Sequence, residues 1–229
     1  MRLLYFLPML AVLYGCSKPQ EAAPPVAAQA PPRTAPQQQR KTPADDRPAL
    51  VCFGDSLTAG LGVEPGQSYP DLLQQNLDRR GLRYRVVNLG VSGDTTQDGL
   101  ERLPLVLDEK PRIVLVEFGA NDGLRGQPVL IAEQNLSQII EGLQKAHVQV
   151  VLAGITLPPN YGPEYIRKFD AMYPELASRY KVPLLPFLLA GVAGKADLMQ
   201  RDGLHPNAVG TRLVERNVFA ALEPLLKKE

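Results

Sequence analysis

The sequence predicts an α/β fold: a three-layer α/β/α sandwich around a five-stranded parallel sheet of the flavodoxin-like kind. Three observations lead to this prediction. Five short apolar runs alternate with segments of helical periodicity along residues 49–229. The runs are continuously apolar, as expected for strands that are covered on both faces. Glycine-rich polar clusters follow the strands, and parallel sheets of this kind place their functional sites at the carboxyl ends of strands.

Each predicted element has a local justification. The first apolar run stops at Gly54, and Ser68 followed by Pro70 is typical of the start of a helix. The segment IVLVEF, at 113–118, is the strongest strand, and Val129–Lys145 has clear amphipathic periodicity. The predicted strands are 49–53, 84–89, 113–118, 148–154 and 182–185. The predicted helices are 69–80, 96–107, 129–145, 164–180 and 207–228, and Pro104 is expected to kink or restart the second of these.

Composition and charge exclude several classes of protein. Of the 229 residues, 45% are hydrophobic and 21% are charged, which is the balance of a globular domain with a core. A formal net charge of +1 gives no reason to expect a nucleic-acid-binding surface. Two cysteines cannot form a disulfide framework. No apolar stretch reaches the ~18 residues of a membrane-spanning helix.

Residues 1–15 have the layout of a signal peptide. Arg2 precedes an apolar run that ends before Gly15 and Cys16. This ending resembles the lipobox of bacterial lipoproteins, which implies lipidation of Cys16 and anchoring to an envelope membrane. Ser17 is not the aspartate associated with inner-membrane retention, which favours the outer membrane. A plain signal peptide or a short buried helix is the alternative.

Residues 16–48 are expected to form a disordered tether. From residue 17 to residue 48, proline, alanine and glutamine fill 20 of the 32 positions, and large apolar side chains are nearly absent. Such a segment cannot bury enough surface to offset the entropy lost on ordering. The predicted domains are therefore a signal peptide at 1–15, the lipidated cysteine and tether at 16–48, and a catalytic domain at 49–229.

Four polar blocks carry the functional signal. They read GDSLTAG at 54–60, GVSGD at 90–94, GANDG at 119–123 and DGLHP at 202–206. Together they resemble the SGNH hydrolase (GDSL esterase) family. The neighbouring segments SGDTTQDGL, NDGLRGQP, LPPNYG and DGLHPN are similar to the bacterial arylesterase, thioesterase I and lysophospholipase L1 group. The resemblance covers residues 49 to about 225 and implies the SGNH hydrolase fold.

Ester hydrolysis needs a nucleophile, a base and a group that orients the base. Ser56 is the candidate nucleophile, because it lies at a strand–helix turn, where its hydroxyl would be exposed. The alternative is that Ser56 is only a helix N-cap. The chain has two histidines. His147, at the end of an amphipathic helix, is expected to be a solvated residue. The resemblance maps His205 to the general base and Asp202, three residues earlier, to its partner.

The resemblance also implies three donors for the oxyanion. They are the backbone N–H groups of Ser56 and Gly93 and the side-chain amide of Asn121. A glycine allows the backbone to approach the substrate closely, and an asparagine donates without carrying charge. The alternatives are a turn glycine at Gly93 and a loop cap at Asn121.

The remaining polar and reactive residues of these blocks are expected to be structural. Asp55, Asp94 and Asp122 can accept loop N–H groups or cap helices, and Cys52 is a small buried residue. The chain lacks a G-x-S-x-G elbow, a P-loop and a zinc-ligand spacing, so no cofactor and no metal are expected.

The predicted activity is serine ester hydrolysis through a covalent acyl-enzyme, with no nucleic-acid partner and a monomeric chain. The implied substrates are aryl esters, fatty acyl esters, lysophospholipids and acyl thioesters. An apolar acyl groove is predicted from residues that lie on loops beside the site: Leu124, Pro158, Pro159 and Tyr161. Packing within those loops is the alternative. A carbohydrate O-deacetylase of the cell envelope is the second functional reading, and a non-catalytic lipid-binding lipoprotein is the third.

Overall fold

The computed structural model describes residues 45–227 of the chain. The predicted signal peptide, the predicted lipidation of Cys16 and most of the predicted tether lie outside these residues. Residues 45–48, at the end of the predicted tether, contact the domain: the carbonyl of Pro48 accepts from the N–H of Arg85 (3.0 Å), and Arg47 pairs with Asp78 (3.3 Å). No helix within the described range is long and apolar enough to cross a membrane.

A five-stranded sheet forms the centre of the domain, with the strand order β2-β1-β3-β4-β5 and parallel pairing throughout. The strands are β1 (Ala49–Gly54), β2 (Arg85–Gly90), β3 (Pro111–Glu117), β4 (Gln149–Ala153) and β5 (Leu184–Leu185). The chain runs from β1 outward to β2, then back across β1 to β3. The connections that follow β1 and β3 therefore leave in opposite directions, and a crevice for a ligand forms between them at the carboxyl ends of these two strands.

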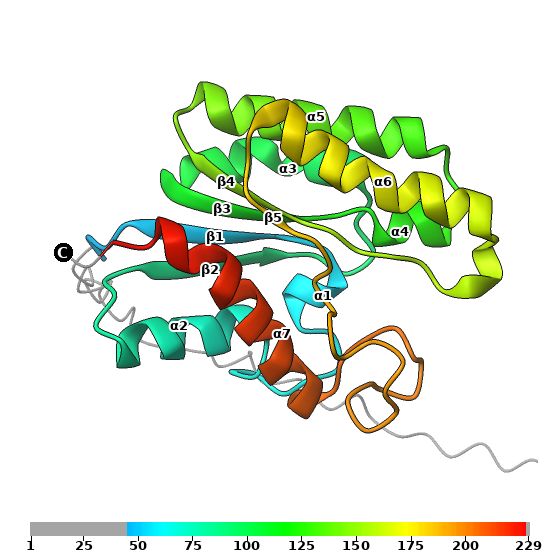
Figure 1. Ribbon diagram of the computed structural model, residues 1–229. Helices are drawn as coiled ribbons and strands as arrows, with labels where there is room; N and C mark the ends of the chain where they lie inside the picture. The colour runs from blue at the N-terminus through cyan, green and yellow to red at the C-terminus, as the bar shows by residue number, and fades with distance from the viewer. Residues whose placement is uncertain (1–44, 228–229) are drawn as a thin grey trace, which may run out of the picture. The chain divides into compact units, whose positions relative to one another are not determined.

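Helices cover both faces of the sheet (Figure 1). On one face lie α3 (Thr96–Asp108), α5 (Val129–Lys145) and α6 (Pro163–Tyr180); on the other lie α2 (Tyr69–Arg79) and α7 (Ala208–Leu222). Short helical turns complete the set: α1 (Ser56–Ala59), α4 (Ala120–Leu124), η1 (Pro159–Tyr161) and η2 (Glu223–Leu225). The predicted three-layer sandwich is therefore confirmed.

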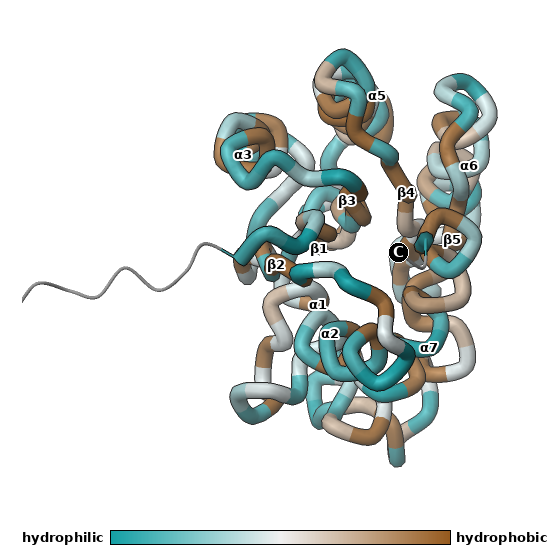
Figure 2. The backbone as a smooth tube through the Cα atoms, turned by 90° about the vertical axis from the view of Figure 1, so that its left-hand side faces the viewer, coloured by the Kyte–Doolittle hydropathy of each residue, from teal (hydrophilic) through white to brown (hydrophobic). Residues whose placement is uncertain are grey.

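The core lies between the sheet and each helix layer. The tube in Figure 2 is strongly hydrophobic along β3 and β4, between the two layers. All six residues of β1 are buried. Phe53 of β1 meets Phe118 edge to face, with ring centroids 4.8 Å apart. Burial of one large apolar side chain stabilises the folded state by about 1.5–3 kcal/mol. The buried strands therefore stabilise the packing of both helix layers on the sheet.

Local capping explains where several helices begin. Ser68 caps α2 and Thr95 caps α3, and each forms a reciprocal capping box with the aspartate three residues later. The amphipathic helix predicted at Val129–Lys145 has those same bounds in the structure.

One prediction about proline and one about helix length need correction. The break expected at Pro104 does not occur, because α3 runs continuously through it. Pro104 lies on the exposed face of α3, where water can hydrate the carbonyl that loses its donor. The last helix ends at Leu222 rather than at 228, and a 3-10 turn that contains Pro224 follows it.

Candidate active site

Ser56 is the first residue of α1, directly after the turn that leaves β1. The helix cap is Asp55, whose Oδ1 accepts from the N–H of Leu57 (3.0 Å). The reading of Ser56 as a simple N-cap is therefore wrong, and its hydroxyl is available for other contacts. Gly54 permits this tight turn, since a Cβ at that position would collide with the side chains of Thr58 and Glu117.

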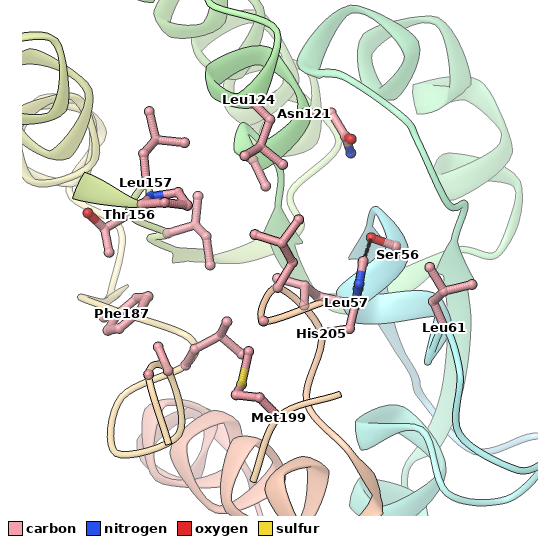
Figure 3. A pocket seen from close by; sticks show the side chains of 18 of the residues that line it. Ser56, Leu57, Leu61, Asn121, Leu124, Thr156, Leu157, Phe187, Met199 and His205 are labelled. Atoms are coloured by element: carbon pink, nitrogen blue, oxygen red, sulfur yellow. Dashed lines mark hydrogen bonds between the residues drawn. The ribbon is translucent and has the colours of Figure 1, made fainter. Parts of the chain in front are cut away.

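His205 reaches Ser56 from the other end of the chain. Its Nε2 lies 2.8 Å from Oγ of Ser56, and its Nδ1 lies 2.7 Å from Oδ2 of Asp202. Figure 3 shows the first of these hydrogen bonds at the wall of a pocket. The Asp202 carboxylate also accepts from the N–H of Leu204 (2.9 Å) and from the N–H of His205 itself (3.0 Å). The Asp202 carboxylate thus fixes both the backbone of this loop and the orientation of the His205 ring. In this orientation Nδ1–H faces Asp202 and Nε2 faces Ser56.

The same hydrogen bonds set the electrostatics of this pair. Partial burial on its own would raise the pKa of Asp202, but the hydrogen bonds from the side chain and backbone of His205 and from Leu204 lower it overall. Asp202 is therefore ionised at neutral pH and can stabilise a positive charge on the imidazole.

Three potential donors, on Ser56, Gly93 and Asn121, line the same cavity. Within residues 45–227, neither the N–H of Ser56 nor the N–H of Gly93 has a hydrogen-bond acceptor. Gly93 has φ +91°, and a Cβ there would meet nothing within 4 Å, so the backbone conformation rather than space calls for glycine. Asn121, at the start of α4, donates from Nδ2 to the carbonyl of Asp94 (2.9 Å) and to Oδ2 of Asp55 (3.3 Å).

The aspartates of the polar blocks have structural contacts, as expected. Asp94 pairs with Arg102 (2.6 Å). Asp122 accepts from both the N–H and the hydroxyl of Thr96 (2.9 and 2.6 Å). These bonds tie the loops after β2 and β3 to α3, and they hold Gly93 and Asn121 in place beside Ser56.

An apolar cavity of about 640 Å³ opens beside Ser56 and His205. Leu124 lines it from the end of α4, and Pro158 and Pro159 line it from the segment after β4, as the sequence predicts. Tyr161 does not line it; the Tyr161 hydroxyl instead donates to the carbonyl of Leu124 (2.9 Å). Three of the four predicted groove residues are therefore brought together, and the fourth supports one of them.

Sequence reasoning missed most of the far wall of this cavity. In Figure 3, Ser56 and Asn121 lie on one side, and Leu157 and Phe187 lie on the other. The residues that were missed are Leu57, Leu61, Ile155, Leu157, Phe187, Leu189, Met199 and Leu204. Six of these follow β4 or belong to the irregular segment 186–204. The signal that could have found them is the density of large apolar residues in a segment without regular secondary structure.

His147 lies away from the site. It follows α5, before β4, in the left-handed conformation (φ +60°), and its side chain is exposed. Cys52 lies in β1 and is fully buried, and burial raises the pKa of its thiol far above the usual range, which keeps it inert.

Comparison with known proteins decides the family. Residues 52–213 match the model of the GDSL-like lipase/acylhydrolase family. The chain belongs to this family. The family membership and the similarity to curated esterases together make the protein a carboxylic ester hydrolase that acts on acyl esters.

Several relatives are similar over most of the domain. Esterase TesA of Pseudomonas aeruginosa is 46% identical over 179 residues, which cover 77% of this chain and 89% of the relative. Thioesterase 1/protease 1/lysophospholipase L1 of Escherichia coli is 42% identical over 181 residues, with 79% and 86% covered. The crystal structure of TesA gives a TM-score of 0.76 at 44% identity and covers 78% of this hydrolase and 99% of that chain. The SGNH hydrolase esterase AlinE4 gives a TM-score of 0.66 at 44% identity, with 80% and 98% covered.

Proposed function

We propose that this hydrolase cleaves acyl esters by a two-step transfer in which Ser56 is the nucleophile, His205 the general base and Asp202 its partner. The observation that carries the proposal is the continuous chain of hydrogen bonds from Asp202 through His205 to Ser56, with distances of 2.7 and 2.8 Å. Its open end faces an apolar cavity.

In the first step, His205 takes the proton from the Ser56 hydroxyl while Oγ bonds to the acyl carbon. The carbonyl oxygen becomes an oxyanion and accepts hydrogen bonds from the N–H groups of Ser56 and Gly93 and from the Asn121 amide. His205 then gives the proton to the leaving alcohol as the ester bond breaks. In the second step, His205 takes a proton from water, and the hydroxyl attacks the acyl carbon. His205 then returns that proton to Oγ of Ser56 as the acyl–Oγ bond breaks, which releases the acid and restores the free serine.

The cavity supports a fatty acyl group as the acyl part of the substrate. A volume of about 640 Å³ exceeds what an acetyl group needs, and the walls are largely leucine, isoleucine, proline, phenylalanine and methionine side chains. The relatives of this hydrolase include a protein named as a thioesterase and lysophospholipase and a protein named as an arylesterase. We therefore favour medium- or long-chain esters, including aryl esters and lysophospholipids. Acyl thioesters rank below them, because the envelope anchor proposed below would keep the enzyme away from acyl thioesters of the cytoplasm.

The test is the hydrolysis of p-nitrophenyl esters from acetyl to palmitoyl by the purified chain. The proposal expects the highest kcat/KM at a medium or long acyl chain. Activity confined to the acetyl ester would favour a carbohydrate O-deacetylase instead. A phosphonate gives a second readout, since a related esterase of Pseudoalteromonas has been solved in a form inhibited by monoethylphosphonate. Intact mass should increase by one phosphonyl group in the parent protein and not in Ser56→Ala.

We further propose that the enzyme is a monomer held in the bacterial envelope through a lipid on Cys16. The support is the sequence of residues 1–48 and the similarity to a Bacillus subtilis protein named as a lipoprotein, which is 31% identical over 115 residues. Metabolic labelling with palmitate, compared between the natural chain and Cys16→Ser, tests the anchor. Label that persists in Cys16→Ser would contradict it.

A further inference from the structure

A buried acid lies directly behind the nucleophile. Glu117 is the last residue of β3 and is fully buried. Its Oε2 accepts from the hydroxyl of Thr58 (2.8 Å) and from the N–H of Asp55 (3.4 Å). Its Oε1 is the one buried side-chain oxygen or nitrogen in the described part of the chain without a hydrogen-bond partner. An ionised Glu117 would therefore leave a buried, charged oxygen unsatisfied, which is costly.

No cation neutralises this acid within residues 45–227. The guanidinium of Arg102 lies over the ring of Phe53, but it is paired with Asp94. Burial first, and then the nearby Asp55 carboxyl, raise the pKa of Glu117 well above its usual range. Burial, the unsatisfied Oε1 and the nearby Asp55 carboxyl all favour the neutral form of Glu117, which can act as a donor.

Asp55 is the acceptor available to that donor. Burial raises the pKa of Asp55 to about 6, against the opposing effect of the Leu57 N–H. The N–H of Asp55 bonds to Oε2 of Glu117, so the two acids are adjacent, and each changes the pKa of the other: Asp55 raises the pKa of Glu117, and Glu117 lowers the pKa of Asp55. These opposite effects are those expected of two adjacent acids of which Glu117 keeps its proton and directs it toward Asp55.

The second oxygen of Asp55 connects the pair to the reaction site. Oδ2 of Asp55 accepts from Nδ2 of Asn121 at 3.3 Å, while the other hydrogen of that amide goes to the carbonyl of Asp94 at 2.9 Å. The bond to Asp55 is the longer of the two, so it is the one that a substrate oxyanion can share. An Asp55 carboxylate without the proton from Glu117 would hold the amide more strongly and would place more negative charge beside the oxyanion.

We propose that Glu117 is a positioning residue of this hydrolase, which donates from its neutral carboxyl to Asp55 and so sets how firmly Asp55 holds the amide of Asn121. The inference rests on the proposed role of Asn121 as an oxyanion donor. It predicts an effect on kcat rather than on KM, because the oxyanion exists only after substrate has bound.

The experiment compares two substitutions at Glu117 with a matched control. Glu117→Leu should lower kcat on the order of tenfold with KM nearly constant, a smaller loss than removal of a whole oxyanion donor. Glu117→Gln should retain kcat within about threefold, because its amide both donates to Asp55 and accepts from Thr58. The control is Glu215→Leu, which removes another buried carboxyl, one that bonds to Asn76 (2.7 Å) outside the site. Equal loss of kcat in Glu117→Leu and Glu215→Leu would overturn the inference.

A double-mutant cycle separates this inference from the proposed function. In an Asn121→Ala background, Glu117→Leu should cost no more than about twofold in kcat, since the residue that it positions is gone. Full additivity would overturn the inference while leaving Asn121 in its role. An Asn121→Ala protein with undiminished kcat would overturn the role of Asn121 itself.

A second variant covers the case in which Glu117→Leu does not fold, as judged by circular dichroism. Thr58→Val removes the hydroxyl that lies between Glu117 and Tyr69, at 2.8 Å from each, but keeps the carboxyl. The Thr58 hydroxyl orients the Glu117 carboxyl, so without it the carboxyl can turn away from Asp55. Thr58→Val should therefore lower kcat, as Glu117→Leu does, and this loss should vanish when Asn121 is alanine. A Thr58→Val protein with unchanged kcat would contradict the positioning role.

Discussion

The hydroxyl oxygen of Ser56 lies 2.8 Å from Nε2 of His205, although 149 residues separate the two in the chain. Ser56 follows strand β1, and His205 precedes the last α-helix, α7. The parallel sheet brings them together, because the connections at the carboxyl ends of its strands all open on one edge.

The two histidines of the chain provide an internal comparison. His205→Ala should lower kcat by at least about 10⁴-fold, because the serine loses its base. His147→Ala should leave kcat unchanged, since that side chain is exposed and follows α5. Steady-state kinetics on one ester, with circular dichroism to verify folding, make the comparison. Similar activity in the two variants would mean that His205 is not the base.

Gln200 holds the loop of the base against the loop of the nucleophile. Its Nε2 donates to the carbonyls of Leu61 (2.7 Å) and Pro206 (2.9 Å), and its N–H donates to the carbonyl of His205 (2.8 Å). Gln200→Leu keeps the backbone bond but loses the other two, so we expect a loss of kcat on the order of tenfold from misplacement of the ring.

The matched control for this variant is Gln144→Leu. Gln144 also donates from Nε2 to a backbone carbonyl, that of Tyr180 (2.9 Å), and it is exposed on α5. Its substitution should leave kcat as it is. If Gln200→Leu behaves in the same way as Gln144→Leu, the bridge between the two loops does not position the base.

Phe187 forms part of the cavity wall opposite Ser56 (Figure 3). Phe187→Ala removes apolar contacts that only a longer acyl chain reaches. Each methylene buried is worth about 0.8 kcal/mol, so kcat/KM for the decanoyl ester should fall about tenfold while that for the acetyl ester changes little. Leu130→Ala, which removes an exposed leucine of α5 away from the cavity, is the control. An equal loss on both esters would place the acyl chain elsewhere.

The protonation of Glu117 predicts how stability depends on pH. Unfolded, its carboxyl loses its proton near the ordinary glutamate pKa, whereas burial raises that pKa in the folded protein. Over the interval between the two values the folded state binds more protons, so the stability of the natural protein falls as pH rises. Glu117→Gln does not titrate. Its free energy of unfolding, relative to the natural protein, should therefore increase as the pH rises above the ordinary glutamate pKa of 4.5.

Urea unfolding at several pH values measures this difference. Other carboxyl groups contribute to both proteins and largely cancel. A relative stability that is flat or falls with pH would show that Glu117 is ionised in the folded chain.

The strands and long helices could be predicted because their signals are local. β1 and β3 are continuous apolar runs, and Val129–Lys145 has an unbroken amphipathic pattern. The five-residue helix α4 was missed because ANDGL is too short to show periodicity. The break at Pro104 was predicted wrongly, because sequence alone does not reveal that this residue faces solvent.

The residues of the candidate site likewise divide into those with a local sequence signal and those that only the packing reveals. The polar blocks pointed to Ser56, Gly93, Asn121 and His205, and the structure brings all four together. The far wall of the cavity was missed because it comes from the irregular segment 186–204. Glu117 was hidden inside the strand IVLVEF, where only the packing of β3 against α1 shows that a carboxyl points at the turn of the nucleophile.

The most direct test of the central claim is the rate of ester hydrolysis by Ser56→Ala beside the natural chain, on the ester that the latter prefers. The substitution removes one oxygen and leaves the cavity, His205 and Asp202 in place. The account predicts a loss in kcat of at least about 10⁴-fold. Retention of activity within about tenfold of the natural chain would contradict a covalent acyl-enzyme on Ser56.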